Sequence, residues 1–222
     1  MNARRIISIF LFVFLLYCMT SCTSDADPSG FIQPPEFEKY SDLIGQPKDA
    51  VLAKLNLTEQ DLIEITEGMY VTEKLRGEYL DSTFITALNF SLMSTENPLV
   101  GFSYQTGYRS MEEAIPYLYK LSQHITEEYG LCDEAKWPGA DISGPHIFAE
   151  HTEESLFQLA GRTNGFQRNS WELHADGNSR FIMELAMECM DKEEETLVNV
   201  TLSYAVRGTD GRLPDEVTAP PS

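Results

Sequence analysis

The residues best suited to chemistry lie in a stretch rich in glycine, proline and acidic side chains. Within it, His146, Glu150 and His151 could supply imidazole nitrogen and carboxylate oxygen to a metal ion. The two histidines are five positions apart, whereas a helix brings residues three or four positions apart onto one face. A metal site here therefore requires the chain to fold back on itself. The alternative is a solvated loop that leads into a short helix from Glu153.

The sequence contains no pattern typical of covalent catalysis or cofactor binding. It has no Gly-x-Ser-x-Gly turn, which exposes the nucleophile of many hydrolases, and no glycine-rich phosphate loop ahead of a helix. Paired carboxylates discriminate nothing in a chain with 35 acidic residues. We predict no catalytic residue and no cofactor, and we favour a binding role. An enzyme or metal-dependent module built on residues 146–154 is the alternative hypothesis.

Two cysteines, Cys132 and Cys189, lie in the second half of the chain. In an exported protein they could form one disulfide, which would stabilise the fold by ~4 kcal/mol in the chain-entropy account. The alternative is two separate thiols, because Cys189 belongs to an alternating apolar pattern and a lone cysteine packs there as a small hydrophobe. Both interpretations remain open at this stage.

The N-terminus carries the most specific pattern. Arg4-Arg5 precede an apolar run over residues 6–19, which is shorter than the ~20 residues of a membrane-spanning helix and indicates a secretion signal. Its end, Met19-Thr20-Ser21-Cys22, resembles the lipobox of bacterial lipoprotein precursors. The resemblance implies cleavage before Cys22 and a diacylglycerol on its sulfur. The alternatives are an ordinary secretory peptide cut near Ser21 and an uncleaved anchor.

This resemblance predicts where the protein resides and how it meets a membrane. We expect an exported protein held by its lipid on the outer face of the cell membrane, or on the outer membrane if the envelope has one. The chain has a formal net charge of −19. Because such a surface repels anionic headgroups and phosphates, we expect no nucleic-acid partner and no membrane contact beyond the lipid.

Hydrophobic periodicity predicts an α+β fold with about six antiparallel strands and helices on one face. A helix opens with Pro47 at its first position, a long one runs between Ser110 and Gly130, and a short one covers 153–160. The expected strands cover residues 63–70, 84–92, 100–104, 170–175, 181–190 and 197–206. A further short strand is expected near 147–149.

The strand at 181–190 has the clearest alternation. Glu184 and Glu188 are expected to face water, and five apolar residues are expected to face the core: Phe181, Met183, Leu185, Met187 and Cys189.

Domain boundaries follow from composition. We expect a signal peptide at 1–21, a flexible tether at 22–36, one α+β domain at 37–208 and a disordered tail at 209–222. Two halves, 37–108 and 109–208, each read as a helix followed by a strand meander, and the similar endings Phe102-Ser103-Tyr104 and Leu202-Ser203-Tyr204 are consistent with two diverged repeats. The alternative, which we favour, is one sheet with helices on one face and no duplication.

A second resemblance concerns the start of the domain. The run from Gly45 to Leu55, ahead of strands, is similar to the helix opening of envelope domains of the β-lactamase-inhibitor-protein and outer-membrane-assembly-lipoprotein type. Those domains bind other proteins and are not enzymes. The resemblance implies a lipoprotein whose acidic domain binds a protein or an envelope ligand.

Overall fold

The computed structural model describes residues 37–136, 147–162, 167–176, 179–192 and 195–208. These residues belong to one compact unit that begins at Pro35. Among the described helices, none has both the length and the hydropathy that crossing a membrane requires. The segments expected to be a signal peptide, a tether and a tail, and Cys22 with them, lie outside the described residues.

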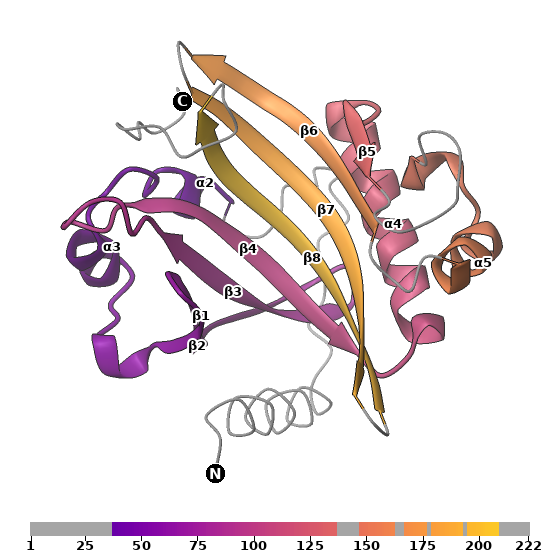
Figure 1. Ribbon diagram of the computed structural model, residues 1–222, viewed down its shortest axis with the longest axis horizontal. Coiled ribbons are helices and arrows are strands. Elements are labelled where there is room, and N and C mark those ends of the chain that lie inside the picture. The colour runs from indigo at the N-terminus through magenta and orange to yellow at the C-terminus, as the bar shows by residue number, and fades with distance from the viewer. Residues whose placement is uncertain (1–36, 137–146, 163–166, 177–178, 193–194, 209–222) are drawn as a thin grey trace. The chain divides into compact units, whose positions relative to one another are not determined.

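The described elements are helices and strands, which confirms the α+β class (Figure 1). The helices are α2 (Phe37–Ser41), α3 (Lys48–Lys54), η1 (Glu59–Asp61), α4 (Met111–Tyr129), η2 (Phe148–Glu150) and α5 (Glu153–Arg162). The strands are β1 (Ile63–Thr66), β2 (Met69–Tyr79), β3 (Ser82–Phe90), β4 (Leu99–Tyr108), β5 (Glu134–Lys136), β6 (Gln167–Asp176), β7 (Ser179–Lys192) and β8 (Glu195–Gly208).

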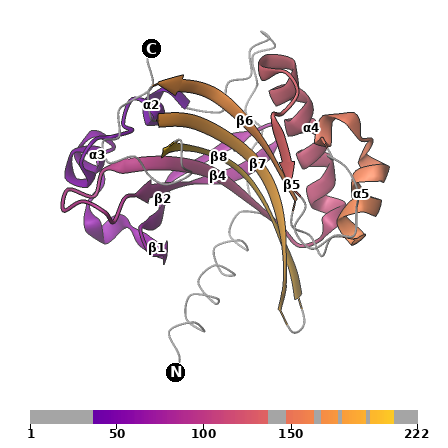
Figure 2. The same cartoon turned by 45° about the horizontal axis from the view of Figure 1, so that its top comes forward.

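All eight strands form a single antiparallel sheet in the order β1-β2-β3-β4-β8-β7-β6-β5. The first four strands and the last four are therefore two meanders, and the final strand of each meets the other at the centre of the sheet. The long strands β6, β7 and β8 are bent, and α4 with α5 lies along one side of them (Figure 2).

The expectation of about six strands is too low. The predicted strand 63–70 is in fact β1, a turn with Gly68 at φ 78°, and the start of β2. β2 continues through four charged residues in the run Glu73–Glu78, which obscure any alternation. β5 has only three residues and exists by pairing with β6, and its sequence alone does not indicate a strand.

Residues 147–149 also differ from expectation, because they lead into the 3₁₀ turn η2 and form no strand. The backbone N–H of Phe148 donates to Asn169 Oδ1 at 2.8 Å, and the Phe148 ring is fully buried. A tertiary contact with β6 thus sets the local conformation. The local hydrophobic pattern of the sequence cannot predict this contact.

One face of the sheet carries the hydrophobic core, and helices α2, α3, α4 and α5 all place buried side chains in it. Aromatic rings from the central strands lie at its middle: the Phe102 and Tyr204 rings stack with centroids 5.0 Å apart. Phe37 of α2 adds a third ring, 4.6 Å from Tyr204. Contacts of this kind add to the area that the rings bury.

Helix α4 confirms the predicted start and stop. The Ser110 hydroxyl accepts a hydrogen bond from the Glu113 backbone N–H at 3.3 Å, and the Glu113 carboxylate accepts one from the Arg109 N–H at 3.1 Å. This reciprocal cap satisfies N–H groups that have no partner within the helix. Gly130, at φ 79°, ends the helix.

The alternation of β7 predicts a contrast in stability. Leu185 is fully buried, so Leu185→Ala should lower the free energy of unfolding by ~2 to 5 kcal/mol. Glu188 is exposed on the opposite face, so Glu188→Ala should change it by less than ~0.5 kcal/mol. Urea unfolding of the domain measures both. Equal losses would contradict the register of β7.

Candidate functional site

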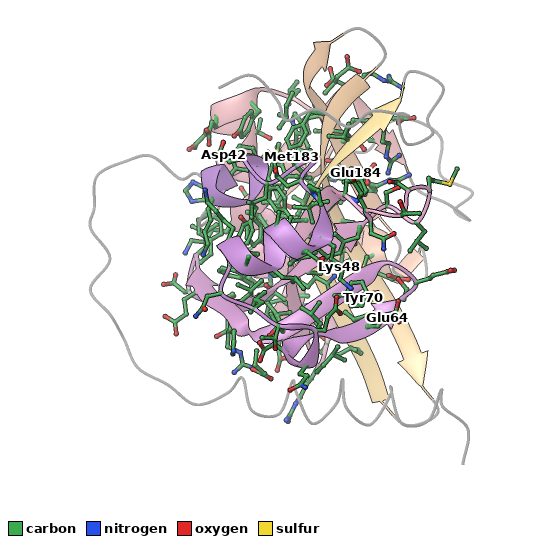
Figure 3. All side chains as sticks on the ribbon, turned by 90° about the vertical axis from the view of Figure 1, so that its left-hand side faces the viewer. Asp42, Lys48, Glu64, Tyr70, Met183 and Glu184 are labelled. Atoms are coloured by element: carbon green, nitrogen blue, oxygen red, sulfur yellow. The ribbon has the colours of Figure 1, made fainter. Side chains whose placement is uncertain are left out.

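The face of the sheet opposite the core is the candidate functional surface, and we call it the outer face. Successive residues of a strand point to opposite faces. On β7, Met183 is fully buried in the core, and Glu184 lies on the outer face; both are labelled in Figure 3. Cross-strand pairing then assigns the remaining residues of the outer face.

The middle of the outer face consists of short or uncharged side chains. Ser103 of β4 pairs with Ser203 of β8, and the same row continues to Ala87 on one side and to Glu184 on the other. The two adjacent rows contain Asn89, Gly101, Ala205 and Ile182, and Ile85, Gln105, Thr201 and Ala186. Ala87 and Ser103 are almost fully buried, although they lie outside the core cluster.

Glu184 is the one charged residue in these central rows, and it is firmly paired. Its carboxylate lies 3.3 Å from Arg168 Nη1 and 3.3 Å from Arg207 Nη2. It also accepts a hydrogen bond from the Ser170 hydroxyl at 3.3 Å. The Glu184 side chain is only 15% exposed. Strands β6, β7 and β8 thus each contribute to one ion-pair network.

The expectation that Glu184 faces water therefore needs correction. Alternation gives the correct face, and Glu188 on the same face is exposed. Alternation cannot show that two arginines on neighbouring strands lie beside Glu184, because this depends on how the strands are aligned. The sequence clue to these ion pairs is a basic residue at an outward-facing position of each strand that flanks β7.

Charged residues surround the central rows of the outer face. Among the described side chains that cross-strand pairing places on this face, four are basic, namely Arg76, Arg168, Arg180 and Arg207. Five are acidic: Glu184 within the central rows, and Glu78, Glu134, Glu172 and Glu188 around them. These described charges are nearly balanced, whereas the whole chain has 16 basic and 35 acidic residues.

Of the three predicted metal ligands, the structure describes Glu150 and His151. His146 lies outside the described residues. Glu150 belongs to η2, and the His151 ring nitrogen Nδ1 lies 3.2 Å from the Ser155 hydroxyl, within the start of α5. In the part of the chain that is described, no group of three His, Cys, Asp or Glu side chains could hold a metal ion.

Cys132 and Cys189 are thiols in the structure and lie far apart. Asp133 accepts a hydrogen bond from the Glu172 backbone N–H at 2.8 Å, which places Cys132 beside that end of β6. Glu172 pairs with Ile182, and Cys189 lies seven residues further along β7, roughly 23 Å at ~3.3 Å per residue. A disulfide needs its two Cα atoms within ~7 Å.

The Cys132 thiol is also poorly suited to nucleophilic chemistry. Partial burial, and next the negative charge of Asp133, raise its pKa from 9.0 to about 11. Since the thiolate is the reactive form, this environment suppresses reactivity at neutral pH. Cys132 thus contributes packing at the edge of the core.

Comparisons with known protein families, with curated proteins and with solved structures found no match to this chain.

The Glu184 network predicts a measurable loss of stability. Glu184→Ala leaves Arg168 and Arg207 without their shared carboxylate in a partly buried position, so the free energy of unfolding should fall by ~1 to 3 kcal/mol. Glu188→Ala, which removes a charge from an exposed position of the same strand face, is the matched control. A loss at Glu184 no larger than at Glu188 would show that the network contributes nothing to stability.

The raised pKa of Cys132 predicts slow alkylation. Relative to the urea-unfolded chain, about hundredfold less thiolate is present below pH 9, and the greater nucleophilicity of a more basic thiolate offsets part of this. Iodoacetamide should therefore modify Cys132 about tenfold more slowly in the folded protein, as measured by peptide mass spectrometry at pH 8. Equal rates would contradict the burial of this thiol.

Proposed function

We propose that this protein is a non-catalytic, lipid-anchored component of a bacterial cell envelope, and that its outer face binds a protein partner. The observation that carries the proposal is the composition of that face. The side chains of its central rows are uncharged apart from Glu184, which is ion-paired with two arginines, and charged side chains surround these rows.

This composition matches the usual anatomy of protein interfaces. Their centres are depleted in charged residues, their rims are polar, and arginine is enriched in them. Exposed arginines and glutamates around an uncharged middle keep such a face soluble until the partner covers it. Short, partly exposed residues such as Ser203 and Ala205 leave room for larger side chains from a partner.

The lipid supports the same function by fixing location. A polar tether after Cys22 would hold the acidic domain near the membrane without embedding it. A protein held in this way meets partners in the envelope at high effective concentration.

We further infer that the outer face arose by duplication of one four-strand unit. The matching triplets at 102–104 and 202–204 lie side by side, with Ser103 directly opposite Ser203. A twofold axis through this pair relates β3 to β7, and it superposes Phe84-Ile85-x-x-Leu88 on Phe181-Ile182-x-x-Leu185. Identical residues at positions equivalent in the sheet support a common ancestor of the two halves.

Site-specific crosslinking tests the binding face. With benzoylphenylalanine at Thr201 or Ile182 on the outer face, illumination of cells should yield one discrete adduct that contains a second protein. The same group at Glu112 of α4 or Glu154 of α5, both exposed, is the control and should yield none. Adducts only from the helix positions would contradict the assignment.

The lipid anchor has its own test. Cys22→Ala should move the protein from the membrane fraction to the soluble fraction, because stable attachment then loses the acyl chains and the acidic domain offers no replacement. Cell fractionation with an antibody to the domain measures the change. Retention in the membrane with residues 1–21 intact would indicate an uncleaved anchor instead.

A further inference from the structure

Three arginines gather at one corner of the outer face. Arg180 of β7 and Arg207 of β8 are direct cross-strand partners. Arg168 of β6 is joined to Arg207 through Glu184, which lies 3.3 Å from each. Arg180 has its own carboxylate, Glu172, at 3.2 Å. Three guanidinium groups thus share two carboxylates.

This corner has more hydrogen-bond donors than acceptors. Each guanidinium carries five N–H donors, and Glu184 must also accept from Ser170. Like charges directly opposite one another weaken an antiparallel pair, so the pairing of Arg180 with Arg207 does not serve the sheet itself. Arg180 and Arg207 remain 35% and 39% exposed, and can reach a further acceptor.

The two glutamates indicate which group this corner accepts. A guanidinium binds a carboxylate with two parallel N–H donors, a geometry that a lysine cannot supply. Glu184 and Glu172 already accept some of the N–H donors of these arginines. Because the rest of the protein is strongly acidic, a negatively charged partner meets favourable charge at a corner of this kind and repulsion over most of the remaining surface.

We propose that the corner formed by Arg168, Arg180 and Arg207, which we call the arginine corner, binds the carboxylates of an acidic segment in the protein partner. The inference rests on the proposed binding role of the outer face and specifies the chemistry of its ligand. The segment crosses the ends of β7 and β8, and its carboxylates bind the exposed sides of Arg180 and Arg207.

Binding of labelled oligopeptides tests the arginine corner. The full-length lipidated protein in non-ionic detergent is titrated against fluorescein-labelled hexaglutamate and hexalysine, and anisotropy is recorded at low and physiological salt. We expect hexaglutamate to bind with a salt-sensitive affinity. The double variant Arg180→Gln/Arg207→Gln should weaken that binding at least tenfold, whereas Arg109→Gln, which changes an exposed arginine just before α4, should leave it unchanged.

A second variant probes the internal carboxylate. Glu184→Gln keeps the shape of the side chain but removes a competitor for Arg168 and Arg207, so it should tighten hexaglutamate binding severalfold. In the wild-type protein, the Nε–H resonances of the three arginines should shift on adding hexaglutamate. This measurement decides the question even if a variant fails to fold.

Two results would overturn the arginine corner: equal hexaglutamate binding by the double variant and by Arg109→Gln, or unshifted arginine resonances together with a preference for hexalysine. The crosslink from benzoylphenylalanine at Thr201 separates this inference from the proposed function. If either of these results is obtained but the Thr201 crosslink forms, the outer face still binds a partner and only the acidic segment is wrong. If hexaglutamate binds but no Thr201 crosslink forms, the proposed function is contradicted.

Discussion

Strands β4 and β8 hydrogen-bond to one another at the centre of the sheet, and the rest of the structure depends on this pairing. It is the junction between the two meanders, and without it each would be a separate four-stranded sheet. The approach is close at Gly101, where a Cβ atom would lie 2.5 Å from the carbonyl oxygen of Tyr204. A side chain at this position would therefore force the central strands apart.

The same pairing produces both faces of the sheet. On one face it brings Phe102 and Tyr204 into a stacked contact at the middle of the core. On the other it places Ser103 opposite Ser203, so the middle of the outer face is formed by short polar side chains. Because successive residues of β4 and β8 point in turn to the core and to the outer face, a change in their register would alter both the packing of the core and the composition of the outer face.

Local patterns in the sequence were sufficient for elements whose signals are local. The caps of α4, at Ser110 and Gly130, and the apolar face of β7 could be read directly. β5 and η2 could not, since β5 exists through its pairing with β6, and η2 is held by a hydrogen bond from Phe148 to Asn169.

The candidate site shows the same limit. Glu184 was placed on the correct face, but the alignment of β6, β7 and β8 decides that it meets Arg168 and Arg207. Conversely, the chemistry that the sequence suggested around Glu150 and His151 is not assembled among the described residues. The metal-site hypothesis came from residues that are near one another in the sequence, whereas the network around Glu184 joins residues from three strands.

The central claim is that a partner covers the outer face in the envelope, and thiol footprinting tests it most directly. Thr201→Cys on the outer face and Glu154→Cys on α5 are prepared with Cys132 and Cys189 replaced by serine. A bulky maleimide should label both thiols in the purified protein. In intact envelopes it should label Glu154→Cys at the same rate and Thr201→Cys at least tenfold more slowly. Equal labelling of Thr201→Cys in both preparations would contradict the account.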